Sequence, residues 1–203
     1  HDRLRLELAR AELARQAGDR RAALAAAERA HDLARSGFLL ERLRAAVLLA
    51  PLLTDLGAAG RAREVVDEAL TACLGNVDTA RLHALRAWLR ELGGESGADR
   101  EMGEAWRQTG EGAWHLVRSD WARIEPLVWK AVESGEIAPA NVVEAISDAF
   151  PAGDAEFDLL AHTDDRVRLA AAGAVAASGH PGAAARLAEM AKADDDERVR
   201  VVA

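Results

Sequence analysis

The chain has 203 residues with a net charge of -8, and half of its residues are hydrophobic although only 4% are aromatic. The negative charge disfavours nucleic-acid binding by this segment, and no apolar run approaches the roughly 20 residues that cross a bilayer. The one cysteine, Cys73, excludes an internal disulfide and a multi-cysteine zinc site and favours a reducing, cytoplasmic compartment.

Hydrophobic residues at helical spacing predict a first helical hairpin. Leu4, Leu8 and Ala11 recur before the break Ala17–Asp19, and apolar residues from Ala23 to Leu33 recur after it. The two helices are rich in arginine, which forms either a local basic face or a solvated one. These arginines are Arg3, Arg5, Arg10, Arg15, Arg20 and Arg21.

The following segment predicts a second hairpin. A helix from about Phe38 to Leu56, which Pro51 is expected to bend, precedes the turn Gly57–Gly60, and Arg61–Leu74 forms its partner. Cys73 inside this partner helix is expected to be a small buried hydrophobe.

The two hairpins resemble each other in sequence. A shift of 42 residues places Gly18 over Gly60 and small residues over small residues. The stretch Gly18–Ala23, with the alanines after it, resembles the second half of a tetratricopeptide repeat. The spacing looks more like the degenerate repeats that follow the ATPase module of large bacterial transcriptional regulators. This resemblance implies that residues 1–93 form tetratricopeptide-like hairpins of a right-handed α–α superhelix, used as the sensor or interaction arm of a regulator.

A third helix, Asp78–Leu92, ends at the linker-like stretch Gly93–Asp99, where we place the first boundary. Residues 94–124 then form a tryptophan-rich junction. The tryptophans either fill the wedge between two repeat stacks or form a pocket for a partner or a small molecule. The tryptophans in question are Trp106, Trp114 and Trp121 within this junction and Trp129 shortly after it.

The clearest internal repeat lies in the final third. Leu160–Ala171 and Lys192–Ala203 align with a shift of 32 residues, and in each an acidic turn precedes a helix that opens with Val-Arg. The pattern resembles HEAT repeats of the short bacterial type. The resemblance covers about residues 125–203, with Pro126 and Pro139 opening the two helices of a more diverged pair.

The HEAT resemblance implies a ladder between successive repeats. Arg168 and Arg200 occupy the arginine position and Asp194 the acidic position, whereas His162 stands where an aspartate is expected. Val199 and Val202 are expected to share an uncovered apolar face of the last helix, through which a homo-oligomer could form.

No catalytic motif accompanies these helices, and the chain is expected to be neither an enzyme nor a cofactor-binding protein. The scattered histidines predict no metal site. The expected function is therefore a non-catalytic scaffold that binds a protein or peptide partner. Two alternatives remain, a small-molecule sensor at the tryptophans and a HEAT-like DNA glycosylase that uses Asp120 and Trp121.

Overall fold

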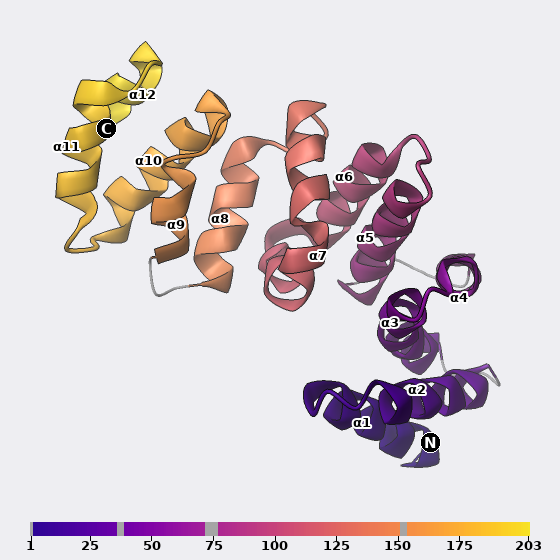
Figure 1. Cartoon of the computed structure of the whole chain (residues 1–203). Coiled ribbons are helices and arrows are strands. Elements are labelled where there is room, and N and C mark those ends of the chain that lie inside the picture. Colours follow the sequence, from indigo (N-terminus) through magenta and orange to yellow (C-terminus); the bar gives the residue numbers. More distant parts are fainter. Residues whose placement is uncertain (1, 36–38, 72–76, 151–153) are drawn as a thin grey trace. The chain divides into compact units, whose positions relative to one another are not determined.

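The computed structural model describes residues 2–35, 39–71, 77–150 and 154–203. In these ranges every regular element is a helix, which confirms the predicted all-α helical-repeat fold (Figure 1). No helix among them is long and apolar enough to cross a membrane. The chain divides into two compact units, residues 1–110 and 111–203.

The first unit is a series of three helical hairpins. Each hairpin pairs a first helix with a second one, and the first helix α3 packs on both α1 and α5. Alanine and leucine dominate these helices, so the backbones approach closely around a core of small side chains. The hairpins are α1 (Asp2–Gln16) with α2 (Arg20–Ala34), α3 (Leu39–Asp55) with α4 (Ala59–Thr71), and α5 (Val77–Leu92) with α6 (Ala98–Thr109).

Glycines in the left-handed conformation close the three hairpins at equivalent positions. The φ angles are 76° at Gly18, 78° at Gly57 and 66° at Gly94. Residues with a Cβ atom rarely adopt such values. The predicted pairing of Gly18 with Gly60 is wrong, because Gly60 lies in the first turn of α4. The true register is 39 residues between the first two turn glycines and 37 between the next two.

The cores of the second helices follow the same register. Ala23 and Ala62, then Ala30 and Ala69, are pairs 39 residues apart, and all four are 0% exposed. An alanine at these places lets each second helix lie close to its neighbours. The sequence contained this register, but the two glycines of Gly57–Gly60 made the longer shift equally plausible.

The stretch Gly93–Asp99 holds the turn between α5 and α6 together with the first two residues of α6, and the compact units divide after Gly110. A glycine cluster suits a tight helical turn as well as a linker, so composition alone could not distinguish the two. Trp106 therefore belongs to α6 of the first unit, where it is 6% exposed.

The second unit also consists of packed helices. Helix α7 packs on α8, α8 on α9 and α10, and α10 on α11 and α12. A short 3-10 turn, η1 (Gly110–Gly112), spans the division. The helices are α7 (Trp114–Glu133), α8 (Pro139–Ala149), α9 (Asp154–Leu159), α10 (Asp165–Ser178), α11 (Ala183–Ala193) and α12 (Glu197–Val202).

Two expectations for this unit need correction. Pro139 does begin α8, but Pro126 lies inside α7 and opens no helix. Val199 is 0% exposed, as is Val167 at the equivalent place in α10, so Val199 belongs to the core and shares no open face with Val202. The 32-residue repeat itself explains this burial, since both valines follow an acidic turn by the same distance.

Candidate functional site

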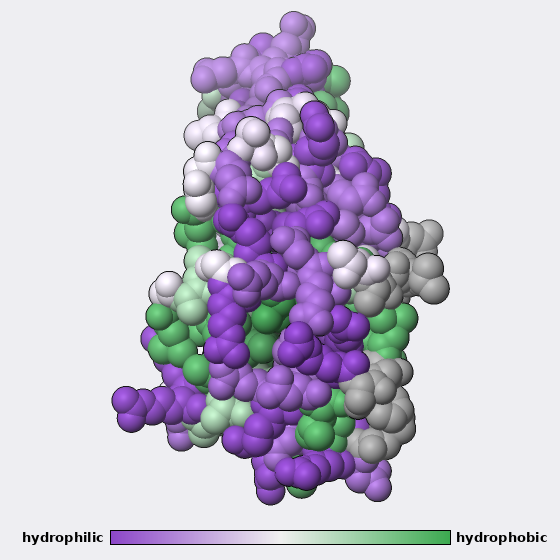
Figure 2. Space-filling model, turned by 90° about the vertical axis from the view of Figure 1, so that its right-hand side faces the viewer, coloured by the Kyte–Doolittle hydropathy of each residue, from purple (hydrophilic) through white to green (hydrophobic). Residues whose placement is uncertain are grey.

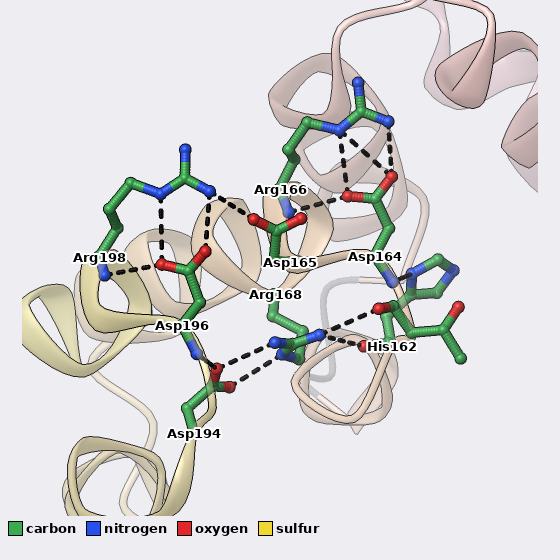
Figure 3. Close-up of polar contacts among 9 residues, drawn as sticks. His162, Asp164, Asp165, Arg166, Arg168, Asp194, Asp196 and Arg198 are labelled. Carbon is green, nitrogen blue, oxygen red and sulfur yellow. Dashed lines mark hydrogen bonds and ion pairs between the residues drawn. The ribbon is translucent and has the colours of Figure 1, made fainter.

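Arg168 of α10 connects the helix-opening turns of two successive repeats (Figure 3). Its Nε donates to Asp194 Oδ2 at 2.8 Å and its Nη2 donates to Oδ1 at 2.9 Å. Its Nη1 donates to the backbone carbonyls of His162 at 3.0 Å and Thr163 at 3.1 Å. The side chains of Arg168 and Asp194 are only 15% and 7% exposed, so this bidentate pair is largely shielded from water.

Arg200 of α12 repeats the backbone half of this arrangement. Its Nη1 donates to the carbonyls of Asp194 at 2.6 Å and Asp195 at 3.1 Å, as Arg168 does one repeat earlier. The carboxylate of Asp194 is bound by Arg168. Arg168 and Asp194 therefore form the expected rung, whereas Arg200 holds the backbone of its own turn.

A second row of ion pairs, missed by the sequence analysis, runs beside the first. Asp164 and Asp196 are the N-caps of α10 and α12, and each also binds the arginine two residues later. Arg198 additionally pairs with Asp165 of α10 (Figure 3). The 32-residue shift was the signal that could have found this row, because it aligns Arg166 with Arg198.

His162 performs one of the two roles that Asp194 has in the later repeat. Its Nδ1 accepts the backbone N–H of Asp164 at 3.1 Å, as Asp194 Oδ1 accepts that of Asp196 at 2.9 Å. The imidazole ring therefore fixes the turn but offers no carboxylate to an arginine.

The preceding helix explains this departure. Helix α8 has Val142 four residues after its N-cap, where α10 has Arg168, so no arginine on α8 would meet a carboxylate at position 162. Instead the ring of Trp129 from α7 lies against His162, with ring centroids 4.5 Å apart.

Two of the four predicted tryptophans lie in one aromatic cluster of the second unit. Trp121 and Trp129 of α7 meet edge to face with centroids 6.0 Å apart, and Trp129 continues to His162. Trp114 lies half-buried at the start of α7, and Trp106 lies in the core of the other unit. The described aromatic cluster thus consists of Trp121, Trp129 and His162.

The first helices of the three hairpins line a groove of about 430 Å³ in the first unit. We call it the basic groove. Its lining consists of Arg5, Leu8 and Glu12 from α1, Arg44, Val47 and Leu48 from α3, and Arg81 from α5.

The three arginines of the basic groove occupy the same place in successive hairpins. Arg5 and Arg44 are separated by the 39 residues that separate the first two turn glycines, and Arg44 and Arg81 by the following 37. We call these three residues the arginine row. Arg5 was predicted to belong to a basic or solvated face, whereas Arg44 and Arg81 were not, because the 42-residue register does not align them with Arg5.

Two further arginines of α1 are partly neutralised by ion pairs. Arg10 pairs with Glu7 at 2.8 Å and Arg15 pairs with Glu12 at 2.6 Å. These two belong to a solvated face of the helix, one of the two alternatives for this arginine-rich segment.

Residues 141–203 match the family model for HEAT repeats. No curated protein and no solved structure matches the chain. HEAT repeats commonly serve as protein-interaction scaffolds. The match includes the Arg168–Asp194 rung and leaves out the first unit, whose tetratricopeptide-like character stays a prediction.

Charge is divided unevenly between the two units. Residues 1–110 contain 17 arginines and 17 acidic residues, so the whole net charge of -8 resides in residues 111–203. Hydrophilic side chains cover most of the face shown in Figure 2, with hydrophobic ones in smaller areas between them. The charge argument against nucleic acid therefore applies to the second unit and carries little weight for the first.

A buried polar cluster ties α5 to α6 in the first unit. Glu101, 8% exposed, accepts a hydrogen bond from Arg86 Nη2 at 2.6 Å and contacts His83 Nδ1. Burial by itself would raise the pKa of Glu101, but the hydrogen bonds of His83 and Arg86 outweigh it and hold that pKa below its ordinary value. We interpret this cluster as a structural one that holds α5 against α6.

No group of three or more histidine, cysteine or acidic side chains in the described ranges is arranged to hold a metal ion. Cys73, expected to be a buried hydrophobe, lies outside the described residues.

Proposed function

We propose that this chain is a non-catalytic scaffold for protein–protein interaction and forms the sensor or interaction arm of a larger bacterial, cytoplasmic regulatory protein. It requires no reactive residue or cofactor, because stacked helical hairpins offer an extended surface that recognises a partner by shape and charge.

The observation that carries the proposal is the basic groove. A surface built from one helix of each of three hairpins, with an equivalent arginine on each, is suited to a partner that extends across several repeats. The HEAT-repeat match in the second unit supports the same class of function, since HEAT repeats commonly act as interaction scaffolds.

The test is a search for a partner followed by reconstitution. The purified chain is immobilised, proteins retained from an extract of the source cells are identified, and each candidate is produced separately. A partner that binds the purified chain with a defined stoichiometry and a dissociation constant of about 10 µM or tighter supports the scaffold. Failure of every reconstituted candidate to bind counts against it.

A small-molecule sensor is a second candidate, and one observation favours it. Trp121, Trp129 and His162 form a half-buried aromatic cluster whose rings could stack on a planar ligand. Quenching of tryptophan fluorescence by a metabolite, abolished in Trp129→Leu, would favour the sensor. The glycosylase alternative receives less support, because Asp120 is held by Arg123 on the same helix at 3.5 Å.

A further inference from the structure

We propose that His31 makes the contact between the first two hairpins sensitive to acid, so that α1–α2 loosens from α3–α4 when the imidazole takes up a proton. The proposal concerns the fold itself and does not depend on the scaffold function.

His31 lies on α2, where the first hairpin packs on the second. The residue is 7% exposed, and nearby Ala30 and Ala34 are 0% exposed in a small core that they share with Ala45 of α3. The hairpin α1–α2 packs on the rest of the first unit chiefly through α3. A change of charge at His31 therefore acts on the contact that joins the two hairpins.

The ring nitrogens of His31 lack good hydrogen bonds. Nδ1 is buried and has no hydrogen-bond partner among the residues that the structure describes. Nε2 lies 4.0 Å from Oε2 of Glu68 on α4, which is beyond hydrogen-bond length. A proton adds a second N–H donor and a charge to the ring, and a buried charged donor without an acceptor is less stable than a neutral one. These surroundings therefore favour the neutral imidazole.

The charged groups around the ring do not compensate fully for a proton. Oε1 of Glu68 already accepts from Nη2 of Arg42 on α3 at 2.6 Å and lies 3.5 Å from Nε of Arg35. Burial has the largest effect on His31 and lowers its pKa, as do the guanidiniums of Arg35 and Arg42. Glu68 and Asp32 raise it, but the net result is a pKa below the ordinary imidazole value.

The sign of the pH dependence follows from this lowered pKa. When α2 is released, the imidazole reaches water and binds a proton more readily than in the packed state. The stability of the contact is therefore complete above the ordinary imidazole pKa of about 6.5 and is lost as the pH falls from there towards the lowered pKa of the folded chain. Each pH unit in this range changes the equilibrium by at most about tenfold.

The loosening should remain on one side of the contact. Helices α3 and α4 both pack on α5, so the second hairpin keeps a packed neighbour when the first one moves. Hairpins in a repeat array contact mainly their neighbours, and one can open while the others stay packed. The basic groove is lined by both α1 and α3, so acid would also alter this groove.

The experiment is hydrogen exchange of the full chain at about pH 7.5 and about pH 5.5, expressed as protection factors so that the intrinsic effect of pH on exchange is removed. We expect protection in α2 to fall about three- to tenfold on acidification, and protection in α5 to change by less than about twofold. His31→Leu has a similar volume and cannot titrate, so its α2 protection should stay within about twofold. The control His115→Gln, at an exposed position of α7, should respond to acid as the unmodified chain does.

A second measurement follows the titration of the ring directly. The imidazole signal of His31, assigned by its loss in His31→Leu, is followed by NMR between about pH 8 and about pH 4. Its midpoint should lie below about 6.5, and Glu68→Gln should lower it further, because that change removes the carboxylate that favours the charged ring.

Circular dichroism at both pH values establishes that each variant is folded. The proposal is overturned if His31→Leu loses α2 protection on acidification as the unmodified chain does, or if α5 loses as much protection as α2. A His31 midpoint at or above about 6.5, or one that Glu68→Gln raises, would overturn it as well.

Discussion

The Arg168–Asp194 rung should contribute more to the stability of the second unit than any exposed ion pair beside it. Arg168→Ala removes two hydrogen bonds to a carboxylate that is 7% exposed and two to backbone carbonyls, and it leaves Asp194 without its counter-charge. Breaking a fully buried pair costs about 3–5 kcal/mol, and partial exposure of Arg168 lowers the expected loss to about 2–3 kcal/mol.

Arg166 provides a matched control on the same helix. Its guanidinium binds Asp164 two residues away at 2.6 Å, but the Arg166 side chain is 46% exposed. An exposed pair of this kind contributes about 0.2–1 kcal/mol. For a unit of this size each kcal/mol shifts the melting temperature by about 4–8 °C. Arg168→Ala should therefore lower the melting temperature by about 8–24 °C and Arg166→Ala by less than about 8 °C.

A double-mutant cycle isolates the pair itself. Arg168→Ala is combined with Asp194→Asn, because asparagine keeps an oxygen that accepts the backbone N–H of residue 196. Unfolding in urea is monitored through hydrogen exchange of peptides from α10. We expect a coupling energy of at least about 1 kcal/mol, against less than about 0.5 kcal/mol for Arg166 with Asp164. Equal coupling in the two cycles would refute the reasoning.

Three further predictions concern pH, register and helix packing. The hydrogen bond of Arg168 lowers the pKa of Asp194 in the folded chain. The stability that this carboxylate contributes is therefore complete above its unfolded pKa of about 3.9 and is lost as the pH falls below that value. The urea midpoint of unfolding should fall on acidification, and it should fall less steeply in Asp194→Asn. Gly57→Ala should destabilise the first unit by about 1 kcal/mol, whereas Gly60→Ala should be neutral or stabilising by up to about 1 kcal/mol in thermal melts; the opposite order would restore the 42-residue register. Glu101→Ala should lower the free energy of unfolding by about 2 kcal/mol and speed hydrogen exchange in α5, whereas Glu104→Ala, at a half-buried position, should change it by less than about 0.5 kcal/mol. Similar effects of the two changes would show that the cluster does not stabilise the unit.

Strong local patterns predicted much of this fold. The apolar periodicity found the helices around Gly18, and the Val-Arg repeat placed Val167 and Val199 in equivalent turns of α10 and α12. The sequence pattern could not show whether Gly57 or Gly60 is equivalent to Gly18, because the two glycines differ in backbone conformation and not in residue type.

The candidate site was harder to predict than the fold. Arg44 and Arg81 are ordinary surface arginines until the true register places them beside Arg5. Arg168 and Asp194 were expected together because the resemblance to HEAT repeats implies a ladder of this kind, and the structure pairs them. A binding residue whose position depends on the spacing between helices can be predicted only when that spacing is known.

Asp194 both fixes the turn before α12 and binds Arg168 of α10, so one carboxylate makes two structural elements depend on each other. His162 makes only the first of these contacts. The ionic part of the coupling along the second unit should therefore be uneven: α10 and α12 share a carboxylate and should lose part of their amide protection together when it is removed. Helix α8 is joined to α10 by apolar packing and lacks an Arg168-like rung, so its amide protection should respond less to the loss of Asp194.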